Sequence, residues 1–347
     1  MTLAEPTRQA PGRDRRTRRV VTVTVVLSVA LVVGALLAAT LGRYPLSVPA
    51  IVTTLADPSA HPGDAQVLFE VRLVRIAAAA LIGAALALAG AAFQAVFRNP
   101  MVSPDVLGAS GGAGTGASLA LLLGLGVAGI QTLAFVGGLG AVLLALLVDR
   151  LIDRRGSVLT LILTGLVVSS TCSALISLIK YVGDPENRLP QITFWLLGGL
   201  SSVRPSDVVL LGGSLLVGGA VLIALRWRLT ALSFGDEQAT ALGVDVRLVR
   251  LTTIVAATLL TAVAVSVSGV VGWVGLIIPH LARILVGSDN RVVVPVAAIA
   301  GALFLLGVDT VSRAVSAIEI PLGILTALLG APVFLYLLAL GRRRGWL

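Results

Sequence analysis

Ser110 and His280 are the pair in this 347-residue chain whose types suit nucleophilic chemistry. Ser110 lies in Gly108-Ala109-Ser110-Gly111, a G-x-S-G pattern, and His280 is a conceivable general base for it. The pattern covers only a short piece of a glycine-rich tract, where such matches arise easily. Acyl transfer by Ser110 is therefore an alternative interpretation. His280 follows Pro279 in an apolar run, which is more typical of a packed histidine than of a ligand or a proton relay.

Metal-ligating and phosphate-binding patterns are missing from the sequence. Cys172 is the single cysteine and lies in an apolar run, so we expect neither a disulfide framework nor a cysteine metal site. The polar stretch from Asp184 to Arg188 is typical of a solvated loop. A P-loop needs a lysine after glycine, and the one lysine, Lys180, follows Ile179. We therefore expect this chain to bind no metal and no cofactor of its own, and nucleotide energy to come from a separate subunit.

A polar segment from Ser233 to Val244 separates two long apolar runs. It carries helix signals at both ends: Ser233 as an N-cap, Asp236 three residues later as in a capping box, and Gly243 as a terminator. Asp236 and Glu237 also place negative charge at the positive end of the helix dipole. A helix this short is marginal in water by itself, so we expect another molecule to dock against it.

The composition predicts an all-α polytopic membrane protein. Hydrophobic residues make up 57% of the chain and charged residues 12%, against about 45 to 50% and about 25% in ordinary globular domains. A spanning helix needs about 20 apolar residues because the hydrocarbon core is about 30 Å thick. By that measure the sequence predicts about ten spans. They cover residues 20–41, 73–97, 106–125, 130–148, 158–181, 208–225, 248–267, 270–286, 292–308 and 320–340.

Two boundaries between these spans are inferred from glycine, because residues 106–148 and 251–282 are charge-free runs too long for one crossing. Gly124, Gly126 and Gly129 are expected to break the first run, and Gly269 with Gly272 the second. A further segment, Gln191 to Leu200, is too short to cross. Its flanking residues, Pro190 before it and Gly198 and Gly199 after it, predict a re-entrant or interfacial helix.

The basic residues predict the orientation. With ten spans both termini share a side, and most arginines fall on that side, including those of the two tails and those flanking the polar segment. By the positive-inside rule this side is cytoplasmic, so the net charge of +9 records topology and not a nucleic-acid partner. The domain organisation is then a basic cytoplasmic tail (1–19), one transmembrane domain (20–340) and a short cytoplasmic tail (341–347). The basic residues assigned to the cytoplasmic side are Arg8, Arg13, Arg15, Arg16, Arg18, Arg19, Arg98, Arg150, Arg154, Arg155, Arg226, Arg228, Arg247, Arg250, Arg283, Arg291, Arg342, Arg343 and Arg344; those on the other side are Arg43, Arg72, Arg75, Lys180, Arg188, Arg204 and Arg313.

Ordered sequence blocks along residues 20–340 carry a family resemblance. They are Arg72-Leu73-Val74-Arg75, Gly83 to Gly90 with Gln94, Arg98-Asn99-Pro100-Met101-Val102-Ser103-Pro104, Phe194 to Gly199, Ala241 to Val244, Gly275 to Arg283, Asp309 to Arg313, Glu319 to Ala327, and Gly330-Ala331-Pro332. Together they resemble the signature of FecCD-type permeases, the membrane subunits of ABC importers for ferric siderophores, haem and vitamin B12. The resemblance covers nearly the whole chain.

This resemblance implies a type II ABC-importer permease fold in a bacterial cytoplasmic membrane. Similar permeases pair with a second permease subunit, identical or homologous, and sit on cytoplasmic ATP-binding subunits that hold the ATP. They receive substrate from an extracytoplasmic binding protein. For this chain the implied cargo is a ferric siderophore, with haem and cobalamin as alternatives.

The resemblance also implies two groups of site residues. The polar segment matches the coupling helices that fit a cleft on the ATPase, which gives ATPase-coupling roles to Ser233, Asp236, Glu237, Gln238, Ala239, Leu242 and Gly243. Arg72, Arg75 and Arg313 match arginines that meet acidic residues of the binding protein. A structural alternative stays open for these arginines, because interfacial arginines often snorkel and Asp309 with Arg313 forms an i,i+4 pair.

Two other classes of protein are weighed against an importer permease. The G-x-S-G pattern around Ser110 also fits rhomboid intramembrane proteases, but the span count and the lack of a second intramembrane histidine argue against them. An ion-coupled secondary transporter should carry ionisable groups deep in the membrane. In this sequence the charges are predicted at span ends. For Gln94 and Asn99, a structural role at helix ends or between helices is the favoured interpretation.

Overall fold

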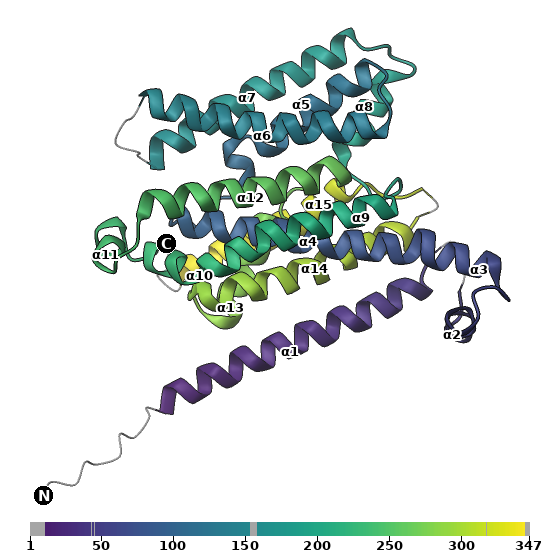
Figure 1. The fold of residues 1–347 in the computed structure, drawn as a ribbon, viewed down its shortest axis with the longest axis horizontal. Coiled ribbons are helices and arrows are strands. Elements are labelled where there is room, and N and C mark those ends of the chain that lie inside the picture. Colours follow the sequence, from purple (N-terminus) through teal and green to yellow (C-terminus); the bar gives the residue numbers. More distant parts are fainter. Residues whose placement is uncertain (1–10, 43, 45, 153–157, 317, 344–347) are drawn as a thin grey trace, which may run out of the picture.

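The computed structural model describes residues 11–42, 44, 46–152, 158–316 and 318–343, and in these residues the protein is an all-helical bundle (Figure 1). The elements in chain order are α1 (Pro11–Thr40), α2 (Val48–Ala56), α3 (Pro62–Gln66), the π-helical η1 (Val67–Arg72), α4 (Leu73–Val96), the 3₁₀ turn η2 (Pro104–Leu107), α5 (Ala109–Leu122), α6 (Val127–Ile152), α7 (Val158–Val182), α8 (Arg188–Leu197), α9 (Pro205–Ser214), the π-helical η3 (Leu215–Gly219), α10 (Ala220–Leu232), α11 (Asp236–Ala241), α12 (Val246–Ser268), α13 (Val274–Val286), α14 (Asn290–Ala314) and α15 (Leu322–Arg343).

Each of the ten predicted spans contains one helix or one continuous helical run, which confirms the all-α polytopic fold. Within the described residues, seven runs are long and apolar enough to cross a bilayer: Arg15–Thr40, Pro62–Val96, Val127–Ile152, Val158–Val182, Pro205–Leu232, Val246–Ser268 and Asn290–Ala314. The other three predicted spans correspond to α5, α13 and α15. Of these, α5 and α13 contain only 14 and 13 residues.

Helix α4 is the centre of the bundle. In the helical run Pro62–Val96, which contains α4, 83% of the most apolar 18-residue stretch is buried. Helix α4 packs against α12, α13 and α14, while α5, α6 and α7 form a second group on the other side of α12 (Figure 1). The closest contact of α4 with α14 is made by two glycines, Gly83 and Gly301. A Cβ on either glycine would overlap the carbonyl of the other. Small residues at such crossings let two helix backbones approach closely, which is the usual basis of packing between membrane helices.

Both predicted breaks between spans are confirmed, although Gly129, one of the glycines expected to make the first break, lies inside α6. Helix α5 ends at Leu122 and α6 begins at Val127, with Gly124 between them at φ 73°; α12 ends at Ser268 and is followed by Gly269 at φ 68°. The predicted short helix is α8, ended by Gly198 at φ 74°. Its start differs from the prediction, because Pro190 lies in the first turn of α8, where the ring removes an N–H that the helix leaves unpaired anyway.

The predicted span 106–125 is wrong at its start. Residues 97–108 follow α4 as an irregular segment with η2 inside it, and α5 begins only at Ala109. This segment folds back along α7 and lies directly against it. A Cβ on Gly165 of α7 would overlap the carbonyl of Val106. The 14 residues of α5 rise about 21 Å, so the backfolded segment occupies the depth that the helix leaves free.

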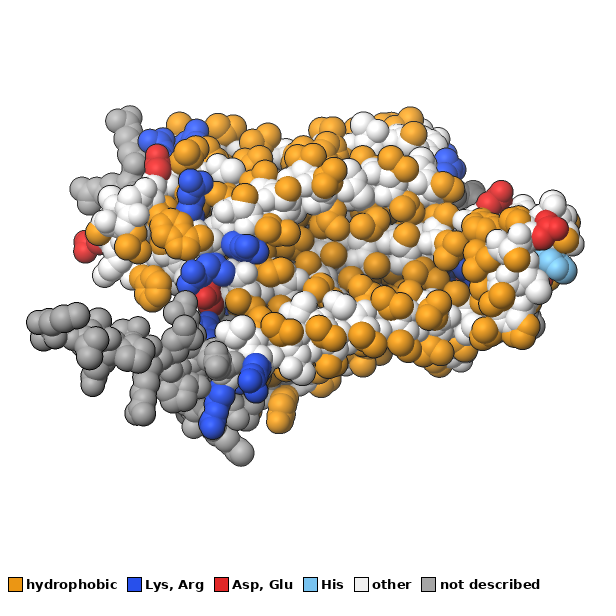
Figure 2. Space-filling view, turned by 60° about the horizontal axis from the view of Figure 1, so that its bottom comes forward, with side chains coloured by type: hydrophobic (Ala, Val, Ile, Leu, Met, Phe, Trp, Pro, Cys, Tyr) orange, Lys and Arg blue, Asp and Glu red, His pale blue; other side chains and the backbone are white. Residues whose placement is uncertain are grey.

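The two ends of the bundle differ in charge. Helix α1 begins, and α15 ends, at the end of the molecule that carries α11, whereas α2 and α3 lie at the opposite end (Figure 1). Figure 2 shows most of the visible Lys and Arg side chains at the α11 end, with an apolar belt between the two ends. Of the basic residues used for the orientation, Arg8, Arg43, Arg154, Arg155 and Arg344 lie outside the described residues, as do parts of both predicted tails.

Candidate functional site

Helix α11 is the predicted polar helix, and its C-terminal end is built as expected. Gly243 adopts φ 78°, and the N–H groups of Gly243 and Val244 donate to the carbonyls of Thr240 (2.9 Å) and Ala239 (3.0 Å). This is a Schellman motif, in which a residue with positive φ after the last turn closes the helix. The prediction that Gly243 terminates the helix is confirmed.

The N-terminal cap was predicted wrongly. Ser233 lies at the end of α10 with helical dihedral angles, and its hydroxyl donates to the carbonyl of Thr230 at 2.6 Å. The N-cap of α11 is Gly235, at φ 119°, which has no side chain to cap with. The preceding membrane helix continues through Leu232, so Ser233 completes that helix and cannot begin the next one.

Asp236 anchors α11 to the bundle and does not cap it. Its carboxylate accepts hydrogen bonds from Arg250 of α12 at 3.0 and 3.2 Å, and Arg98 lies 3.6 Å away after α4. Ala239, one turn later, is fully buried. One face of α11 is therefore held by two helix ends of the bundle, which fixes the direction of the opposite face.

The opposite face of α11 is exposed and part apolar. Glu237 and Gln238 are exposed, and Leu242 is 56% exposed. Phe234, just before α11, is 66% exposed and is a residue that the sequence analysis did not single out. Large apolar side chains gathered at an exposed site are typical of a protein-binding surface.

A hollow of about 350 Å³ adjoins this surface. Phe234 and Leu242 line it together with Trp227 of α10, Arg16 of α1 and Asp289, the N-cap of α14. We call these residues, with Glu237 and Gln238, the α11 surface. It combines exposed aromatic side chains with arginine, and both are enriched where proteins bind one another.

The carboxylate of Asp289 contacts three helices at this end of the molecule. Burial alone would raise the pKa of Asp289, but hydrogen bonds from the Arg291 N–H and guanidinium and from the Thr230 hydroxyl lower it overall. The carboxylate lies 3.7 Å from Arg16 of α1. The ends of α1, α10 and α14 therefore meet at one ionised group.

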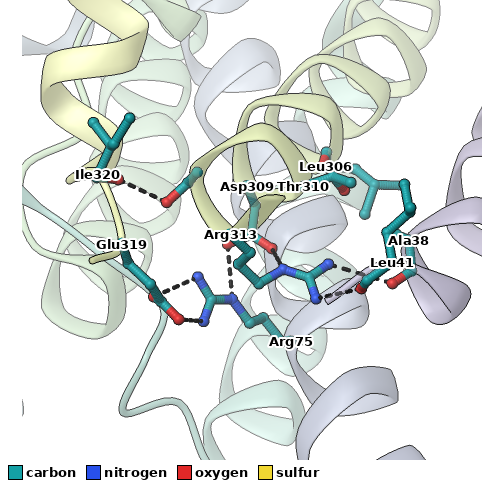
Figure 3. Close-up of polar contacts among 10 residues, drawn as sticks. Ala38, Leu41, Arg75, Leu306, Asp309, Thr310, Arg313, Glu319 and Ile320 are labelled. Carbon is teal, nitrogen blue, oxygen red and sulfur yellow. Dashed lines mark hydrogen bonds and ion pairs between the residues drawn. The ribbon is translucent and has the colours of Figure 1, made fainter. Parts of the chain in front are cut away.

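At the opposite end of the bundle lies a second polar cluster, built around Arg75 (Figure 3). The Arg75 Nε donates to Asp309 of α14 at 2.8 Å, and its two terminal nitrogens donate to Glu319 at 3.0 and 2.9 Å. Asp309 is fully buried, whereas the Glu319 side chain is 30% exposed. The fork of the guanidinium thus joins α4, α14 and the segment that leads into α15.

The other two predicted docking arginines bind mainly backbone oxygens. Arg72 is buried and donates to the carbonyls of Ala39 and Tyr44. Arg313 donates to the carbonyls of Leu41 (3.2 Å) and Ala38 (3.4 Å). Arg313 also pairs with Asp309 at 3.2 Å, which confirms the expected i,i+4 contact. Arg75 and Arg313 pair with the two carboxylates of this cluster, whereas Arg72 binds only carbonyls among the described residues; docking of another protein on the cluster stays a prediction.

The polar residues interpreted as structural have structural partners. Gln94 of α4 donates to the carbonyl of Leu276 on α13 at 3.0 Å and accepts from Arg283. Asn99 accepts from the Met101 N–H at 2.8 Å. Gln94 therefore links two helices, and Asn99 closes a turn after α4.

The structure adds one ionisable residue that sequence reasoning missed. Asp105, in η2, lies beside the middle of α7 and is exposed, so the prediction that the charges cluster at span ends is wrong for this residue. The error follows from placing the start of α5 too early, which put Asp105 at the mouth of a span. The Pro104 ring and Gly108, on either side of Asp105, were the sequence signals for a break there.

The comparison with protein families decides the class. The FecCD transport family matches residues 30–339, nearly the full length of the chain. The chain belongs to the FecCD transport family. It is a permease of the ABC importer type, and its helices make it a multi-pass membrane protein.

Full-length relatives of this FecCD chain agree with the assignment. It is 41% identical to a molybdate import system permease protein of Haemophilus influenzae, over 89% of this chain and 92% of the relative. It is 39% identical to a cobalamin import system permease protein of Halobacterium salinarum, over 94% and 90%. A hemin transport system permease protein of Yersinia pestis is 35% identical, over 90% and 93%.

A solved structure agrees with the fold of the FecCD chain. It is an inward-facing metal-chelate type ABC transporter, 39% identical in sequence, with a TM-score of 0.84 over 92% of this chain and 99% of that one. PsaBC from Streptococcus pneumoniae shares the fold at a TM-score of 0.56 with 19% identity. The permease fold implied by the family resemblance is therefore confirmed by the first of these structural matches.

Proposed function

We propose that this chain carries a ferric siderophore into the cytoplasm as the membrane-spanning subunit of an ATP-driven importer. Support comes from the family and from relatives at 39% identity in Helicobacter pylori that are named as probable iron chelatin transport system permeases. A molybdate permease at 41% identity favours molybdate as the second candidate cargo. Haem and cobalamin are the remaining alternatives, given the relatives that carry those names.

The observation that carries the proposal is the α11 surface. A short helix held by Asp236 presents Glu237, Leu242 and Phe234 to whatever lies outside the bundle. We assign this surface to a cytoplasmic ATP-binding subunit, which binds the ATP, since the arginines gather at the same end and the positive-inside rule places that end in the cytoplasm. Both termini are then cytoplasmic, in a bacterial cytoplasmic membrane.

The cluster around Arg75 is assigned to the outer face, where a binding protein delivers cargo. Arg75 is already paired with Glu319, so an acidic residue of the binding protein must compete with Glu319 for the same guanidinium. Arg72 and Arg313 add positive charge that two carboxylates do not balance, which attracts an acidic surface. A second permease subunit, identical or homologous, completes the pathway.

Arginine substitutions on the α11 surface test the proposed function. We expect Glu237→Arg and Leu242→Arg to abolish ATP-driven uptake while leaving insertion intact, because both side chains point away from the bundle. Thr240→Arg is a matched control for added charge on the same exposed helix. The measurement is uptake and ATPase activity of the complete complex in proteoliposomes. Normal, coupled uptake by both Glu237→Arg and Leu242→Arg would contradict the assignment of α11.

A further inference from the structure

Asp105 lies near the middle of the membrane-spanning depth of the chain. The hydroxyl of Ser169 on α7 lies 3.5 Å from the Asp105 carbonyl, to which it donates, and Gly108 packs against Val168 and Ser169. Ser169 is the twelfth of the 25 residues of α7, so it lies about 17 Å along a helix about 38 Å long. The position of Asp105 is therefore fixed by its contacts with α7, far from either end.

Among the residues that the structure describes, the carboxylate of Asp105 has hydroxyl partners only. Ser110 donates to its Oδ1, and the Ser103 hydroxyl lies 3.5 Å from its Oδ2. No ion pair involves Asp105 in the part of the chain that the structure describes. The Asp105 side chain is exposed at the surface of the chain.

A stripe of serines on α7 continues this polar surface. Ser169, Ser173 and Ser177 are spaced four residues apart and so share one face of the helix. Ser173 donates to the Ser169 carbonyl at 3.0 Å and Ser177 to the Ser173 carbonyl at 2.9 Å. The hydroxyl protons of Ser173 and Ser177 are thereby used within the helix, and that of Ser169 is directed to the Asp105 carbonyl, which leaves oxygen lone pairs as acceptors. Asp105 and this stripe together form a surface of hydrogen-bond acceptors with one negative charge.

The other side of α7 has the opposite chemistry. Leu163, Val167 and Leu175 line an apolar hollow of about 690 Å³ among α5, α6 and α7. Lipid chains suit that side. An exposed carboxylate at mid-depth does not suit lipid, because charged side chains inside a membrane face the bundle interior or a water-filled cavity. Helix α7 thus has one side that is compatible with lipid and an opposite side that requires water or a polar cargo.

We propose that Asp105 selects the charge of the cargo inside the translocation pathway. The carboxylate and its serines favour metal chelates that are neutral or cationic and rich in N–H and O–H donors, and they disfavour anions such as molybdate. This inference rests on the proposed function and deepens it, because it separates the siderophore from the oxyanion among the candidate cargoes.

Thiol modification tests the local charge directly. The reporter is Ser173→Cys, one turn from the Ser169 that binds the Asp105 backbone, in a Cys172→Ala background, within the whole complex in liposomes. Leu175→Cys, exposed on the apolar side of the same helix, is the matched control. We expect the reporter to react with a cationic methanethiosulfonate about fivefold faster than with an anionic one, relative to a free thiol, because of the nearby carboxylate. Asp105→Asn should remove that preference, and Leu175→Cys should react slowly with both reagents.

Two results of this experiment would overturn the proposal. One is a reporter that resists both reagents, which would place Ser173 against lipid or a partner subunit. The other is a cation preference that Asp105→Asn leaves unchanged. Neither depends on ATP-driven transport, so failure here is distinguishable from failure of the proposed function.

The cargo class has its own measurement. The complex with its own binding protein should take up radiolabelled iron held by a neutral trihydroxamate and should not take up radiolabelled molybdate. ATP-driven uptake of molybdate at a rate equal to or above that of the iron chelate would contradict selection by Asp105.

Discussion

At the scale of single residues, the buried cluster of Arg75, Asp309 and Glu319 shows how strongly burial determines the stability that is lost when one partner of an ion pair is removed. Arg75→Ala leaves Asp309 fully buried without its main partner, so we expect a loss of about 3 to 5 kcal/mol in stability. Glu319→Gln removes a partly exposed partner, and about 1 kcal/mol is expected. Thermal unfolding of the purified chain in detergent measures both. Arg98→Ala, which breaks an exposed pair with Asp236, is the control; equal losses at Arg75 and Arg98 would contradict the ranking.

The sequence predicted single residues well where local chemistry decides and poorly where a neighbouring element decides. Gly243 ends α11 as expected because a Schellman turn needs only its own backbone. Ser233 does not cap α11, since α10 continues up to it and uses it first. Arg75 was expected to face a partner protein, and its pairing with Glu319, far away in sequence, could not be read from spacing.

At the scale of elements, the crossing of α4 and α14 depends on the absence of side chains. Gly301→Ala would put a methyl group into the Gly83 carbonyl, so the two helices must move apart and lose packing over the crossing. We expect a loss of about 2 kcal/mol or more. Gly307→Ala on the same helix meets no atom within 4 Å and should be neutral or slightly stabilising. Unfolding in detergent separates the two variants, and equal stability would show that the crossing is not tightly packed.

Most helices were predictable because their apolar runs match the thickness of a bilayer, and the breaks at Gly124 and Gly269 follow from positive φ. The start of α5 was not predictable in this way. Val106 and Leu107 are apolar and read as the start of the next span, yet they lie in η2, within an irregular segment that packs into a space opened by Gly165 of α7. Such a segment is tolerated at membrane depth only when other parts of the protein cover it, and that is a tertiary condition.

At the scale of the whole molecule, the described helices join two polar sites through an apolar belt (Figure 2). Helix α14 runs from its N-cap Asp289, which belongs to the α11 surface, to Arg313, within the cluster around Arg75. One continuous helix therefore connects the proposed ATPase side with the proposed binding-protein side. The all-α fold and the family could be predicted from the sequence, whereas this connection became visible only when both ends of α14 were placed.

The central claim is that the chain is a pathway whose energy comes from a partner subunit. The most direct test is cargo uptake into proteoliposomes that contain this chain with its ATP-binding subunit and its loaded binding protein, compared with liposomes that contain this chain alone. We predict uptake that requires ATP hydrolysis and stops when the catalytic residues of the partner ATPase are replaced. Accumulation of cargo against its gradient by this chain alone, with no nucleotide hydrolysed, would contradict the account.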